Sequence, residues 1–193
     1  MLILRPIEGK ARQLAAHHLF KHILVPVDGS ALAAEVLPAA ASLAKCSNAR
    51  VSLLRVVQPP PMISPEAGIP FTYVADLADD SMTKNLKEEA HEQLSDVARR
   101  FHDESGVEVE AHVVVDRRVG PAILDFAGTH GIDSIAMSTH GRGVSRFLVG
   151  SVADKVLRGS DVPMLLYRPV DIRTKSETAQ PATESQAPTF TRA

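Results

Sequence analysis

The feature that most constrains this chain is an alternation of short apolar runs with longer segments of helical periodicity. Five runs are rich in Val, Ile and Leu, and we expect buried strands at residues 22–27, 50–57, 108–115, 134–138 and 164–167. The segments between them predict helices at residues 31–45, 81–104, 120–130 and 151–158. Pro38 lies inside the first of these helices, and we expect it to kink that helix.

Strands that alternate with helices form βαβ units, and strands covered on both faces are apolar along their length. The sequence therefore predicts an α/β fold, a doubly wound five-stranded parallel sheet with helices on both faces, of Rossmann-like type. Such a sheet binds ligands outside the carboxyl ends of its strands, where the strand order reverses. We expect the site in the loops that follow the first, second and fourth strands.

The length of 193 residues is enough for one domain with a sizeable core. We divide the chain into an N-terminal extension (1–20), one α/β domain (21–169) and a C-terminal tail (170–193). The tail is rich in Thr, Ser, Pro, Gln and Ala, so we expect it to be disordered. Residues 58–80 hold five prolines and form a long loop on the ligand side of the sheet.

Composition excludes several classes of function. A net charge of −2 gives no basic field for nucleic acid, and no apolar run reaches the roughly 20 residues of a membrane helix. Cys46 is the single cysteine and the N-terminus lacks the order of a signal peptide, so we expect a cytoplasmic protein. The eight histidines are scattered, and we predict no metal site.

A glycine-containing loop follows the fourth predicted strand and leads into the last helix, with the sequence STHGRGVSRFLVGS over residues 138–151. Glycine backbones approach phosphates closely, and the first amides of a helix are unpaired donors at its positive end. Ser151 adds a hydroxyl and Arg142 a positive charge, which together favour an anion site. The same residues are also compatible with two turn glycines and a capping serine, and that interpretation stays open.

Two stretches, KHILVPVDGS and DSIAMSTHGRG…GSVADKVLRGSDVPMLLYRP, resemble the universal stress protein family over residues 21–169. The resemblance implies a five-stranded parallel sheet of the adenine nucleotide alpha hydrolase-like type and a homodimer paired through the last strand, Met164–Tyr167. Some members of the family bind ATP through a Gly-x2-Gly-x9-Gly-Ser/Thr motif, and others lack the motif and do not bind. Here Ser138 replaces the first glycine, and eight residues (142–149) replace the nine-residue spacer.

The resemblance also implies which residues line the nucleotide. Asp28 lies near the ribose, although an aspartate here also acts as a helix N-cap. The backbone of Val56 faces the adenine. The positions that the resemblance assigns to the nucleotide site are Pro26, Asp28, Val56, Met137, Thr139, Gly141, Arg142, Gly150, Ser151 and Val152.

These observations favour a regulatory stress-response protein that binds ATP, with or without Mg²⁺. The alternative is an interaction protein of the same fold that binds no nucleotide, and the shortened spacer favours it. A nucleotidyl-transferring enzyme is a third hypothesis, but it requires more polar residues around the phosphates than the sequence offers. We assign no catalytic residue and expect at most slow ATP hydrolysis.

Overall fold

The computed structural model describes residues 2–3, 19–59, 80–139 and 150–168. Most of the N-terminal extension, most of the proline-rich loop and the C-terminal tail lie outside these residues. The predicted site residues Gly141 and Arg142 also lie outside them.

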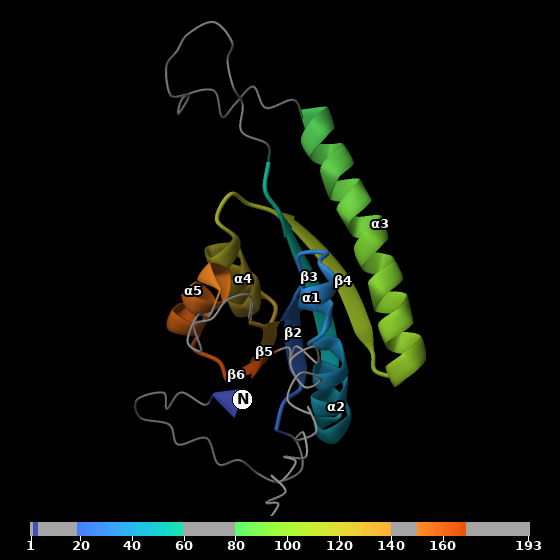
Figure 1. The fold of residues 1–193 in the computed structure, drawn as a ribbon, viewed down its shortest axis with the longest axis vertical. Coiled ribbons are helices and arrows are strands. Elements are labelled where there is room, and N and C mark those ends of the chain that lie inside the picture. Colours follow the sequence, from blue (N-terminus) through green and yellow to red (C-terminus); the bar gives the residue numbers. More distant parts are fainter. Residues whose placement is uncertain (1, 4–18, 60–79, 140–149, 169–193) are drawn as a thin grey trace, which may run out of the picture.

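Six strands and five helices are present in the described part of the chain (Figure 1). The strands are β1 (Leu2–Ile3), β2 (His22–Pro26), β3 (Arg50–Val57), β4 (Val109–Val115), β5 (Ser134–Ser138) and β6 (Met164–Tyr167). The helices are α1 (Ala31–Ala34), α2 (Leu37–Ser47), α3 (Asp80–Ser105), α4 (Val119–Thr129) and α5 (Ser151–Gly159). None of these helices is long and apolar enough to cross a membrane.

The strands form one sheet in the order β1-β6-β5-β2-β3-β4. Strands β2 to β6 are parallel, which confirms the predicted five-stranded parallel sheet. The chain builds outward from β2 through β3 to β4, and then returns to the other side of β2 to add β5 and β6. The strand order therefore reverses between β2 and β5, and ligands bind at such a switch point.

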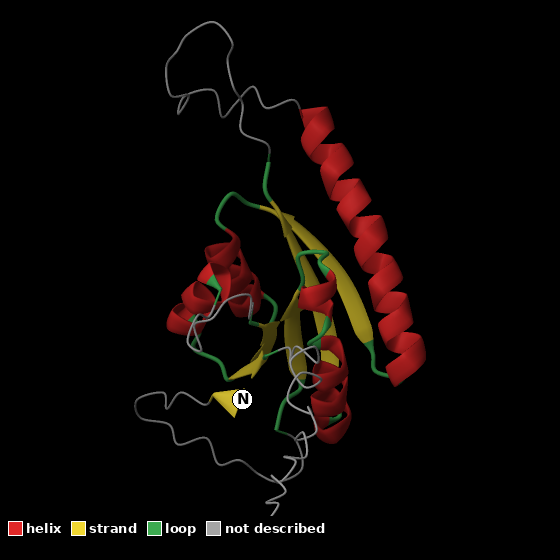
Figure 2. Cartoon of the chain, viewed as in Figure 1, coloured by secondary structure: helices red, strands yellow, loops and turns green. Residues whose placement is uncertain are grey.

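Helices cover both faces of this sheet (Figure 2). Because side chains alternate along a strand, Ile23 and Val25 belong to one apolar cluster, whose helical members come from α1, α2 and α3. Leu24 and Ile135 belong to the other cluster, to which α4 and α5 contribute. Burial of β2 on both faces explains why it is an apolar run rather than an alternating one.

The first predicted helix is wrong in one respect. Instead of a single kinked helix over residues 31–45, the structure has the short helix α1 and the separate helix α2. Pro38 lies in the first turn of α2, where its missing N–H removes no helical hydrogen bond. Asn48 ends α2 in the left-handed conformation, and its N–H donates to the carbonyl of Lys45 (3.4 Å).

Strand β1 was not predicted. It pairs antiparallel with β6, so that Leu2 lies opposite Leu165 and Ile3 lies opposite Met164. The strand proposed from the sequence as a dimer edge therefore has a partner from its own chain over two of its residues. The homodimer itself stays a prediction.

Candidate functional site

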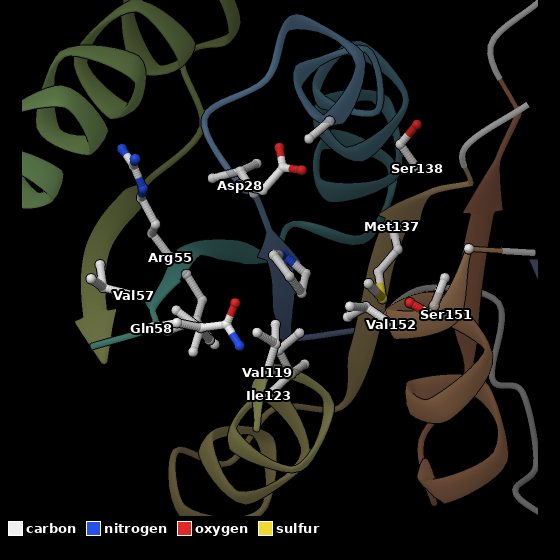
Figure 3. Close-up of a pocket in the computed structure, with 17 residues that line it drawn as sticks. Asp28, Arg55, Val57, Gln58, Val119, Ile123, Met137, Ser138, Ser151 and Val152 are labelled. Carbon is white, nitrogen blue, oxygen red and sulfur yellow. The ribbon is translucent and has the colours of Figure 1, made fainter. Parts of the chain in front are cut away.

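A cavity of about 580 Å³ opens at the switch point of the sheet. The carboxyl ends of β2, β3 and β5 and the first turns of α4 and α5 surround it (Figure 3). Small-molecule sites typically occupy between 300 and about 1,000 Å³, so this volume suits a compact ligand.

Apolar side chains form the inner part of the cavity. Val56 comes from the end of β3. Val119 and Ile123 come from α4, and Met137 comes from β5 (Figure 3). Ile123 and Met137 are buried and belong to the cluster between the sheet and α4. Val56 and Val119 pack against the same cluster, and these surfaces favour a flat group with apolar faces, such as a nucleobase.

The turn after β2 places a carboxylate at the mouth of the cavity. The N–H of Ser30 donates to Asp28 Oδ1 at 2.9 Å, and the N–H of Ala33 donates to Ser30 Oγ at 3.1 Å. Gly29, between them, has a φ of 84°, a conformation that glycine adopts without strain. The capping side chain of α1 is therefore Ser30, whereas Asp28 holds the turn and also lines the cavity.

The first turn of α5 supplies hydrogen-bond donors on the opposite side. Gly150 precedes the helix with extended backbone (φ −56°, ψ 153°), and its carbonyl accepts from the N–H of Asp154 at 2.8 Å. No side chain of the described residues caps this end of the helix with a hydrogen bond, and Ser151 is exposed. The first amides of a helix and a nearby hydroxyl form an environment that favours an anion.

Ser138 ends β5 beside this helix terminus and also lines the cavity. Its Oγ is buried and has no hydrogen-bond partner among the described residues. A buried hydroxyl without a partner loses a hydrogen bond to water, so a polar ligand group at this position would restore that bond.

Two polar residues of the cavity were missed from the sequence. Arg55 donates from Nη1 to Gln93 Oε1 at 2.6 Å, which connects the cavity wall to α3. Gln58 donates from Nε2 to the carbonyl oxygen of Arg117 at 2.8 Å. Both residues lie near the carboxyl end of β3, so the predicted position of the site was the signal that could have identified them.

The structure brings most of the predicted site residues together. Those that line the cavity are Pro26, Asp28, Val56, Met137, Gly150, Ser151 and Val152. Thr139 is not among the lining residues, because its N–H (2.8 Å) and its hydroxyl (3.3 Å) both donate to the carbonyl of Tyr167. It joins the end of β5 to β6 instead.

A comparison with protein families identifies the group to which this architecture belongs. The model of the universal stress protein family matches residues 19–168. The chain belongs to the universal stress protein family. A universal stress protein of Methanocaldococcus jannaschii is 32% identical over 152 residues, which are 78% of this chain and 84% of that protein.

Solved structures of the family have the same fold. A universal stress family protein from Burkholderia pseudomallei is 27% identical and has a TM-score of 0.57 over 77% of this chain and 96% of its own. A universal stress protein of Archaeoglobus fulgidus in complex with dAMP is 24% identical, with a TM-score of 0.51 over 76% and 97%. A universal stress protein solved in complex with cAMP is 19% identical, with a TM-score of 0.50 over 77% of this chain and 97% of its own.

Proposed function

We propose that this universal stress protein is a regulatory stress-response protein that binds an adenine nucleotide in the cavity at the switch point. One observation carries the proposal: the same cavity is lined by buried apolar side chains and by the first turn of α5, whose leading amides are hydrogen-bond donors. A nucleotide has the matching division, with a base whose flat faces are apolar at one end and an anion at the other. The family members that form complexes with dAMP and cAMP support an adenine base.

In this arrangement the base contacts Val56, Val119, Ile123 and Met137. Asp28 lies at the mouth of the cavity, where a ribose hydroxyl would donate to its carboxylate. The phosphates face the first turn of α5, where Gly150, Ser151 and Val152 line the cavity. The phosphate contacts of Gly141 and Arg142 stay predictions from the sequence. The place of Thr139 in the nucleotide site also stays a prediction.

We propose ATP, with or without Mg²⁺, as the physiological ligand. The only carboxylate among the described lining residues is Asp28, and these residues include no histidine or cysteine. Asp28 already accepts a hydrogen bond within its own turn, which disfavours a role as a general base. These observations support nucleotide binding rather than catalysis, with at most slow ATP hydrolysis. We also propose a cytoplasmic location, as expected from the sequence.

The second candidate function is an interaction protein that binds no nucleotide. The spacer of eight residues between Gly141 and Gly150 favours it, because the ATP-binding motif that the family resemblance implies has nine. The two functions make opposite predictions for the affinity of the chain for ATP.

Isothermal titration of nucleotide-free protein with Mg-ATP separates them. We expect the wild type to bind, and a Gly150→Glu variant to lose at least tenfold in affinity because its carboxylate lies where phosphate is expected. Gly150→Ala is the matched control, since the φ of this glycine suits any residue, and it should keep most of the affinity. Absence of heat with folded wild-type protein at millimolar ATP would favour the interaction protein.

A further inference from the structure

The outer edge of β6 presents backbone polar groups that β5 does not use. The carbonyl of Pro163 accepts from the N–H of Ile135 (3.0 Å), and the carbonyl of Tyr167 accepts from the N–H of Thr139 (2.8 Å). Backbone groups of successive strand residues point to opposite sides. Those of Met164 and Leu166 therefore face the other side, where the parallel sheet ends.

Strand β1 lies on this edge. Ile3 is opposite Met164 and Leu2 is opposite Leu165, in antiparallel register. Because Met164 faces outward, its pair with Ile3 is the one that exchanges backbone hydrogen bonds in an antiparallel ladder. The pairing includes two of the four residues of β6.

We propose that β1 is a built-in cover of the β6 edge, and that it competes there with β6 of a second copy of this chain. An unpaired edge strand is a template for another chain. In a dimer with two-fold symmetry, the two copies of one edge strand run antiparallel to each other. The second copy would therefore need the same direction along the edge, and the outward backbone groups of Met164 that β1 already uses.

Covalent attachment gives β1 the advantage in this competition. A segment tethered within one chain reaches an effective concentration on the order of millimolar, whereas a second copy is present at its bulk concentration. The intact chain is therefore monomeric at micromolar concentration, and the homodimer predicted through Met164–Tyr167 forms only when β1 leaves the edge. This competition does not depend on nucleotide binding.

Sedimentation velocity of the full chain and of an Ile3→Pro variant tests the proposal. Proline removes the backbone N–H of residue 3 and weakens β1 without altering the domain core. We expect one-chain mass for the wild type and for the control Ile3→Val, and a concentration-dependent shift to two-chain mass for Ile3→Pro. A wild type that is dimeric at micromolar concentration, or an Ile3→Pro variant that stays monomeric, would overturn the proposal.

A cross-link tests which chain supplies the strand. Leu2 and Leu165 form the pair without mutual hydrogen bonds, whose Cα atoms lie closer together than those of the bonded pair. We expect Leu2→Cys with Leu165→Cys, in a Cys46→Ser background, to form a disulfide within one chain on mild oxidation. On a non-reducing gel, a covalent dimer would show that β1 is exchanged between copies. That result, or no cross-link at all, would contradict the proposal.

Discussion

Gln58 connects the end of β3 to the turn after β4, because its Nε2 donates to the carbonyl oxygen of Arg117 at 2.8 Å. Gln58 immediately follows β3, and Arg117 lies in the turn between β4 and α4. In that turn the N–H of Arg118 donates to Asp116 Oδ1 at 2.6 Å. The hydrogen bond from Gln58 therefore helps to position the turn that leads into Val119, a wall of the cavity.

Substitution of Gln58 by Leu removes this hydrogen bond and keeps a side chain of similar size. A hydrogen bond of this kind contributes about 0.5–1.5 kcal/mol to the folded state. Because the bond acts on the ligand only through the turn before Val119, we expect nucleotide affinity to fall by no more than about tenfold, the factor equivalent to that energy. Because Gln58 is exposed, the free energy of unfolding should change by less than about 1 kcal/mol. Calorimetric titration and urea unfolding check the two quantities, and unchanged affinity would show that the contact does not shape the site.

Gly29 gives a prediction for stability. Any residue at this position must adopt the φ of 84° that Gly29 has. An added Cβ would lie 3.3 Å from the guanidinium carbon of Arg55. We expect Gly29→Ala to lower the free energy of unfolding by about 1–2 kcal/mol, because the left-handed conformation costs that much for a residue with a Cβ. Urea unfolding at neutral pH measures it.

Gly128→Ala is the matched control. Gly128 lies in α4, its φ is not positive, and nothing lies within 4 Å of an added Cβ. Alanine in a helix should leave stability unchanged or raise it by up to about 1 kcal/mol. Equal destabilisation by both substitutions would contradict the role assigned to the turn at Gly29.

His22 makes stability depend on pH. Its side chain is buried, and Nε2 lies 2.8 Å from the hydroxyl of Ser52. Burial lowers the pKa of His22 below its ordinary value of 6.5, and the positive charge of Arg50 lowers this pKa further. Smaller opposing effects come from Glu110 and Asp133.

The direction in which stability changes with pH follows from proton linkage. Since the pKa of His22 is lower in the folded state, the unfolded chain binds the proton first as the pH falls. The contribution of neutral His22 to the free energy of unfolding is present in full above pH 6.5. It is lost as the pH falls through the folded-state pKa. We expect wild-type protein to lose more unfolding free energy between pH 7.5 and about 5 than His22→Gln does. Equal losses would show that another group causes the acid sensitivity.

Much of the architecture could be predicted from the sequence because the parallel strands are buried on both faces. Strands such as His22–Pro26 then appear as short apolar runs between turn residues. The break between α1 and α2 was missed because Pro38 also fits a kink within one helix. Strand β1 was missed because two residues carry no periodicity, and its pairing with Met164 and Leu165 joins the two ends of the described chain.

The site could be predicted only in part. Pro26, Asp28 and Ser151 were found because the family motif includes them. Arg55, Gln58, Val119 and Ile123 reach the cavity through the register of β3 and the packing of α4, which local sequence does not specify. Thr139 was assigned to the site by the family resemblance, but its hydrogen bonds join it to Tyr167.

Titration of isotope-labelled, nucleotide-free protein with ADP, followed by amide chemical shifts, tests the central claim most directly. We predict that the largest changes in chemical shift are those of the amides of Val56, Ser138, Ser151 and Val152, which line the cavity. The amide signal of Ala98 in α3 should stay unchanged. No shifts at millimolar ADP, or shifts that cluster around another surface such as the groove near His112 and His130, would contradict nucleotide binding at the switch point.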